Sequence, residues 1–305
     1  NLVGEFTMLT VGLSLLMGYA GQISLGQATF FGIGAYTTAI AATRFALSPW
    51  LALAMGVLLA AALAYLVGTL IFRLRGHYLA MATLGMNVIV FLVLTQEVAW
   101  TGGPSGFRGV PDLALGSFIF TKDVHYYYLI WFFTLIVIGL SLNIVNSRVG
   151  RAMRALHASE VAAQAVGVDT NAFKVKVFAL SAAYGGLAGG LHATYLGFMS
   201  PSSFGIGVSI EIVVMAVVGG LASVWGALFG AVSVLMIEQY LRKAMKALIP
   251  NASGEHEIIA FGLILMLIMI FVPDGLFAGV IKTVRQWRAS RAVSGQKTRV
   301  KEAVS

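Results

Sequence analysis

Long apolar runs separated by short polar or charged segments make up most of this chain. A helix needs about 20 apolar residues to cross the hydrocarbon core of a membrane, and the pattern predicts about nine such spans. The seventh and eighth are short, so they are either half-helices or a pair that turns inside the protein, where irregular backbone is shielded. We therefore predict an all-α, polytopic membrane protein with spans at residues 2–19, 26–44, 49–72, 77–97, 125–145, 174–197, 208–222, 224–241 and 257–273.

The composition supports a membrane protein. Of 305 residues, 59% are hydrophobic and only 10% are charged, whereas a soluble domain carries about 25% charged residues. The 35 glycines suit helices that pack closely within a bilayer. With no cysteine, disulfides, thiolate metal sites and a cysteine nucleophile are excluded.

The basic residues predict the orientation of the chain. The net charge of +8 comes from residues between and after the apolar runs, which is typical of cytoplasmic loops and not of a nucleic-acid partner. If every span crosses, the segment 73–75, the loop 147–173 and the C-terminal tail face the cytoplasm, and the loop 98–124 is external. The basic cluster at 242–246 then falls on the external side, which conflicts with the rule that basic residues gather in cytoplasmic loops. Because residue 1 also falls outside and begins directly on a span, we expect a further helix upstream.

We predict one transmembrane domain over residues 1–281 and a basic, disordered cytoplasmic tail over residues 282–305. Within the domain, the loop 147–173 is long for a connection between membrane helices, at about 27 residues. Its residues 149–166 are predicted to form one helix with a partial apolar stripe, a basic face and a glycine where the helix ends. Spacing alone leaves two interpretations, a helix lying on lipid phosphates or a docking element for a partner. The stripe is Met153, Leu156, Val161 and Ala165, the basic face is Arg148, Arg151 and Arg154, and the glycine is Gly167.

A resemblance to a known family favours the docking interpretation. Glu160, Ala162, Ala163 and Gly167 form E-x-A-A-x-x-x-G, which resembles the loop by which importer permeases dock on their ATP-binding subunits. Further blocks resemble the LivM-type branched-chain amino acid permeases, and together they cover most of the chain. These blocks are GYAGQISLGQATFFGIGAY (18–36), TGGPSGFRGVP (101–111), SRVGRAMRAL (147–156) and GFMSPSSFGIGVSIEIVVMAVVGGLASVWGALFGA (197–231).

The resemblance implies an all-helical ABC importer permease of about ten spans that carries leucine, isoleucine or valine across the bacterial cytoplasmic (inner) membrane, with its C-terminus in the cytoplasm. The implied partners are a LivH-type permease, two cytoplasmic ATP-binding subunits, an extracytoplasmic binding protein and the lipid bilayer. The chain carries no Walker motif, so we expect it to be a non-enzymatic subunit without a cofactor, whose partners hydrolyse ATP. The related urea and short-chain amide permeases share these blocks and remain an alternative. The implied docking residues are Arg148, Arg151, Arg154, Glu160, Ala162, Ala163 and Gly167.

Several polar residues interrupt the apolar spans, and each has two interpretations. Glu211 lines the translocation path or is solvated at the outer interface. Asn87 lines the path or bonds to a neighbouring helix. Gln22 and Gln27, in a glycine-rich break, contact substrate or cap freed backbone groups. His192 is expected to be packed and hydrogen-bonded, and no metal site is predicted.

Two other functional classes fit less well. A stand-alone secondary transporter would need ionisable residues at mid-membrane to couple ions to transport, and the predicted spans hold almost none. A membrane-embedded enzyme would need a catalytic cluster, and neither H-E-x-x-H nor G-x-S-x-G is present.

Overall fold

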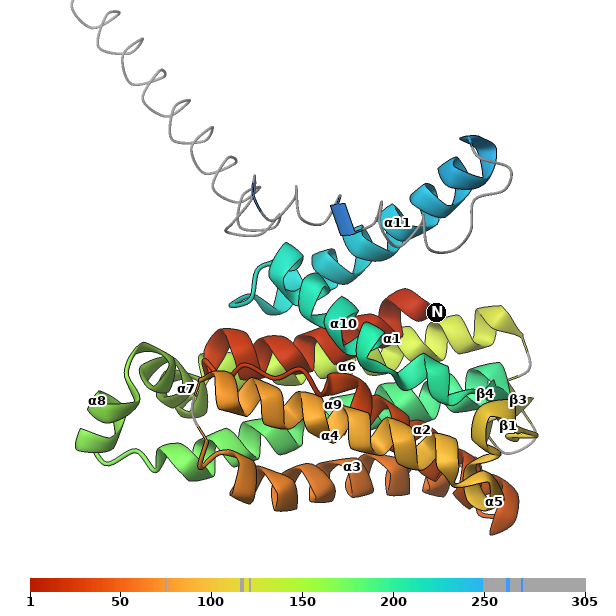
Figure 1. Cartoon of the computed structure of the whole chain (residues 1–305), viewed down its shortest axis with the longest axis horizontal. Helices are drawn as coiled ribbons and strands as arrows, with labels where there is room; N and C mark the ends of the chain where they lie inside the picture. Colours follow the sequence, from red (N-terminus) through yellow and green to blue (C-terminus); the bar gives the residue numbers. More distant parts are fainter. Residues whose placement is uncertain (75, 116–117, 121, 249–261, 264–269, 271–305) are drawn as a thin grey trace, which may run out of the picture.

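The computed structural model describes residues 1–74, 76–115, 118–120, 122–248, 262–263 and 270. Within them the chain folds into long helices that lie side by side, with short helices and two-residue strands at the two ends of the bundle (Figure 1). The helices are α1 (Leu2–Ser14), continued by a π-helical turn (Leu15–Tyr19), α2 (Gln27–Arg44), α3 (Pro49–Ile71), α4 (His77–Gln96), α5 (Val98–Thr101), α6 (Asp123–Asn146), α7 (Arg148–Ala158), α8 (Glu160–Ala165), α9 (Thr170–Leu196), α10 (Ile206–Gly219) and α11 (Val224–Leu248).

The helices agree with the apolar runs, but the count of about nine spans is not confirmed. Among the described residues, six helices are long and apolar enough to cross a membrane. Two more, α2 and α9, are long but less apolar, because they pack against protein at the centre of the bundle and need fewer lipid-facing side chains. The predicted span at 257–273 and the tail at 282–305 lie outside the described residues, apart from 262–263 and 270.

Close packing of α9 against α2 and α3 forms the centre of the bundle. A Cβ added at Gly34 of α2 would lie 2.2 Å from the carbonyl oxygen of Gly186, and one added at Gly189 would lie 2.0 Å from that of Phe31. Only glycine allows backbones to come this close. The aromatic rings of Phe30, Phe72 and Phe178 pack edge to face beside this contact.

The two ends of the bundle differ. At one end lie α7, α8 and the turn between α3 and α4, and at the other lie α5 and the strands (Figure 1). Here β1 (Phe107–Arg108) pairs antiparallel with β4 (Phe198–Met199), and β2 (Ala114–Leu115) pairs with β3 (Phe118–Ile119). The prediction that the loop 147–173 shares an end with the α3–α4 turn, opposite to the loop 98–124, is confirmed.

The α10–α11 pair turns sharply at residues 220–223. At about 1.5 Å per residue, α10 alone is about 21 Å long, shorter than the hydrocarbon core of about 30 Å. The 3₁₀ turn over Pro201–Phe204 lengthens this segment to a candidate span over Pro201–Gly219. The 220–223 turn packs on the π-helical turn that follows α1, since a Cβ added at Gly18 would lie 1.7 Å from the carbonyl oxygen of Leu221.

Candidate functional site

The loop over residues 147–173, predicted from the sequence to be a docking loop and called the docking loop below, folds as two helices and not as the one helix expected over 149–166. Ser147 accepts a hydrogen bond from the Val149 N–H (3.1 Å) and begins α7. Ser159 has extended backbone and accepts a hydrogen bond from the Ala162 N–H (3.2 Å), which begins α8. A serine that caps a helix N-terminus in this way starts a new helix, and the expectation of one helix overlooked this signal.

The break at Ser159 also changes which apolar residues are buried. Met153 and Leu156 of α7 pack inward, as expected for the stripe. In α8 the buried residue is Ala163, whereas Val161 is 72% exposed and Ala165 is also exposed. The prediction of one continuous stripe is therefore wrong for Val161 and Ala165.

The outward surface of the docking loop combines positive charge with exposed apolar side chains. Ala162 is exposed next to Val161, and Val166 is 77% exposed. Gly167 has a φ of +84° at the end of α8, as expected for a glycine that terminates a helix. Its neighbour Val168 donates its N–H to the Ala163 carbonyl oxygen (3.0 Å). The basic side chains exposed on α7 are those of Arg148, Arg151 and Arg154.

Glu160 has a partner within its own chain. Its Oε1 lies 2.8 Å from the Nζ of Lys174, whose side chain is only 3% exposed. Thr170 Oγ1 donates to the same oxygen (3.5 Å) and accepts a hydrogen bond from Gln164 Nε2 (2.8 Å). Both polar side chains of α8 thus reach the first turns of α9.

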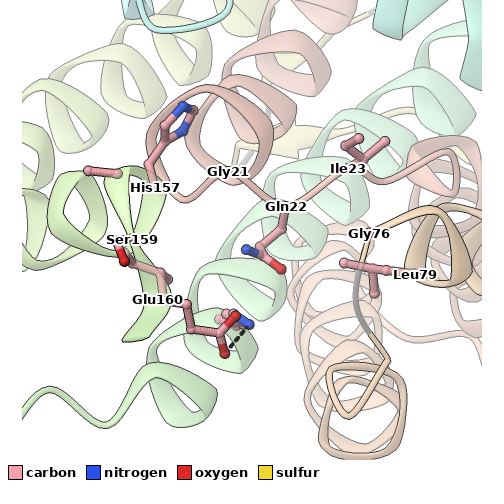
Figure 2. Close-up of a pocket in the computed structure, with 11 residues that line it drawn as sticks. Gly21, Gln22, Ile23, Gly76, Leu79, His157, Ser159 and Glu160 are labelled. Atoms are coloured by element: carbon pink, nitrogen blue, oxygen red, sulfur yellow. Dashed lines mark ion pairs between the residues drawn. The ribbon is translucent and has the colours of Figure 1, made fainter. Parts of the chain in front are cut away.

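A cavity of about 290 Å³ lies between the docking loop and the membrane helices. Figure 2 shows Gln22 extending into this space between Glu160 and Leu79. Gln22 Nε2 donates to the Ala20 carbonyl oxygen (3.0 Å). The structure therefore brings Gln22, a candidate path residue, to the cavity wall that carries the Glu160–Lys174 ion pair.

The helix break over residues 20–26 is the second notable feature. Gln27, its next residue, donates through Nε2 to the carbonyl oxygens of Leu9 (3.5 Å) and Ser181 (3.1 Å), and its Oε1 accepts from Ser181 Oγ (3.2 Å). Leu9 and Ser181 lie midway along their helices, so α2 begins at membrane depth. The Leu25 N–H, freed by the break, donates to Thr83 Oγ1 (3.0 Å).

Asn87 lies close to this break. It is fully buried, and its Nδ2 donates to Thr29 Oγ1 (3.2 Å) and to the Phe204 carbonyl oxygen (3.4 Å). Its Oδ1 has no hydrogen-bond partner among the described residues. Asn87 thus joins α4 to α2 and to the turn before α10.

Glu211 lies on α10 and is half-buried. Ser209, two residues earlier, accepts a hydrogen bond from the Ala28 N–H (3.0 Å). Because two helical residues differ by about 200° in direction, Glu211 points away from the break. The four candidate path residues therefore do not converge on one point.

Glu5 of α1 and His192 of α9 form a pair that was not predicted from the sequence. His192 Nδ1 lies 2.7 Å from Glu5 Oε2, and the Glu5 side chain is fully buried. The histidine also packs against the rings of Phe31 and Phe204, so its expected packed, hydrogen-bonded state is confirmed. An acidic residue within an apolar run was the available signal for Glu5.

Comparisons with known proteins agree on one family. The family model described as the branched-chain amino acid transport system permease component matches residues 1–273. The chain is 31% identical to the high-affinity branched-chain amino acid transport system permease protein LivM of Escherichia coli, over 89% of this chain and 67% of LivM. It is 26% identical to the permease protein BraD of Pseudomonas aeruginosa, over 89% of this chain and 91% of BraD. It is 23% identical to the permease protein LivH of Salmonella typhimurium, over 90% of this chain and 92% of LivH. No solved structure matches the chain.

Proposed function

The chain belongs to the family of branched-chain amino acid transport permeases, and from this premise we propose that it is the membrane-spanning subunit of an ATP-driven importer. Its substrate is leucine, isoleucine or valine, because its relatives LivM, BraD and LivH are named for branched-chain amino acid transport. It carries solute across the bacterial cytoplasmic membrane and leaves ATP hydrolysis to partner subunits.

The observation that carries this proposal is the outward surface of the docking loop. Val161 of α8 and Val166, which caps its C-terminus, are 72% and 77% exposed, and the arginines of the preceding helix α7 are also exposed. Exposed apolar side chains rimmed by charge are typical of protein contact sites. A cytoplasmic ATP-binding subunit covers the two valines in this proposal, and the arginines pair with acidic groups on that subunit.

The docking of α8 on a cytoplasmic subunit also sets the orientation of the chain in the membrane. With the docking loop in the cytoplasm, the opposite end, with α5 and the β1–β4 pair, is extracytoplasmic and faces a substrate-binding protein. The C-terminal tail is then cytoplasmic.

A second permease of the LivH type completes the membrane channel, and two ATP-binding subunits complete the complex. Gln22, Gln27, Asn87 and Glu211 are proposed to lie along or near the translocation path.

The docking surface is tested by a charged substitution at an exposed valine. We expect Val161→Asp to abolish co-purification of the ATP-binding subunits in mild detergent, because it places a carboxylate in an apolar contact. Val98→Asp is the matched control, since Val98 is 61% exposed on α5 at the opposite end of the bundle. Equal recovery of the ATP-binding subunits with both variants would show that α8 is not the docking element.

A further inference from the structure

The ion pair between Glu160 and Lys174 joins the docking loop to the central helix of the bundle. The Lys174 side chain is 3% exposed, and its Nζ lies 2.8 Å from Glu160 Oε1. A lysine is almost never this buried unless its charge is paired. The carboxylate that neutralises it belongs to α8, the short helix that carries Val161 and is followed by Val166. The glutamate of the E-x-A-A motif is therefore engaged inside this chain.

Lys174 stands on α9, which packs against α1, α2 and α3. The second polar contact of α8, from Gln164 to Thr170 (2.8 Å), also ends on the first turn of α9. A displacement of α8 therefore acts on α9 directly, through side chains, and not only through the connecting residues 166–169. Because α9 and α2 approach at glycines, a shift of α9 also moves the helix that begins at the break.

The cavity beside the ion pair leaves room for such a displacement. The cavity has a volume of about 290 Å³ and is lined by the start of α8, the end of α7, the helix break and the α3–α4 turn (Figure 2). At its wall, α7 contacts the break at Gly21, where an added Cβ would lie 3.2 Å from His157 Nδ1. The open space thus lies on the side of Glu160 that faces Gln22 and Leu79, while the ion pair attaches α8 to α9 and α7 stays in contact with the break.

We propose that Lys174 is a positioning residue that holds the docking helices to α9 through Glu160, so that movement of the ATP-binding subunits is passed into the membrane helices. This inference rests on the proposed function and deepens it. It assigns the force-transmitting contact to a pair within this chain, whereas the partner-facing contact is made by the exposed valines and arginines.

The test measures the number of substrate molecules taken up per ATP hydrolysed by the full complex in proteoliposomes. We expect Lys174→Met to lower this ratio roughly 5-fold or more, the lower end of typical couplings between sites, because the docking helices lose their charged attachment. Lys176→Met is the matched control on the same helix, where Lys176 is exposed, and it should keep the wild-type ratio. Reversal of the pair, Lys174→Glu together with Glu160→Lys, should restore coupling that each single reversal loses.

Each outcome decides the proposal. If Lys174→Met couples as well as Lys176→Met, the inference is wrong. If Lys174→Met fails to assemble, the reversed pair decides instead, because restored assembly without restored coupling would leave Lys174 a merely structural role. Failure of the proposed function is a separate result, since the wild-type complex in the same vesicles would then show no ATP-dependent uptake of branched-chain amino acids.

Discussion

Buried polar side chains gather around the point where α2 begins. An unpaired polar group at membrane depth costs several kcal/mol, so an interrupted helix is tolerated only where protein satisfies the freed groups. Leu25, Gly26 and Ala28 donate their backbone N–H groups to the hydroxyls of Thr83, Ser24 and Ser209. These residues therefore support an irregular segment in the membrane, whatever contact they also make with solute. The polar side chains around this point that are at most 1% exposed are those of Ser24, Gln27, Thr29, Thr83, Asn87, Ser181 and Ser209.

Gln27 provides the residue-scale prediction. Gln27→Leu removes the bonds to Ser181 and leaves buried polar groups unpaired, which costs about 1–3 kcal/mol. We expect a lower midpoint of thermal unfolding in detergent than for wild type. Gln96→Leu, at the exposed end of α4, is the control and should unfold as wild type does. Equal midpoints for the two variants would mean that Gln27 does not support the break.

At the scale of elements, the described helices follow the predicted spans to within about four residues, because a lipid-facing helix must be apolar along its length, except that α11 continues past the predicted end at 241 to Leu248. The docking loop shows the limit of that pattern. Its buried stripe was predicted correctly for Met153 and Leu156 and wrongly for Val161, since the extended backbone of Ser159 restarts the helix. A capping serine within a helix-forming segment is a local signal that hydrophobic periodicity does not register.

The packing of α9 against α2 gives the element-scale prediction. Gly189→Ala would place a Cβ 2.0 Å from the Phe31 carbonyl oxygen, so the two helices must separate at a cost of about 1–3 kcal/mol. We expect a lower yield of folded protein by size-exclusion chromatography. Gly139→Ala on α6, where an added Cβ meets nothing within 4 Å, should leave the yield unchanged. A normal yield of Gly189→Ala would contradict this packing.

At the scale of the whole molecule, the contacts between distant parts of the chain could not be predicted from the sequence. The Glu5–His192 pair and the β1–β4 register bring together segments far apart in the chain whose proximity no periodicity encodes. The Glu160–Lys174 pair joins two consecutive helices and was not predicted either. The blocks that resemble the LivM-type permeases identified the family nonetheless. Two of them meet in the structure, where Arg108 of 101–111 lies 5.2 Å above the ring of Phe198 of 197–231. The arrangement places the loop 147–173 at one end of the bundle and the β1–β4 pair at the other (Figure 1).

The measurement that tests this account most directly is uptake of radiolabelled leucine into proteoliposomes. The chain is reconstituted with its second permease and ATP-binding subunits, and the binding protein is supplied outside. We predict that leucine accumulates only when ATP is enclosed and every subunit is present. Accumulation by the chain alone without ATP would contradict the account and identify a stand-alone transporter. ATP-dependent uptake of urea or a short-chain amide in place of leucine would keep the importer and overturn its substrate.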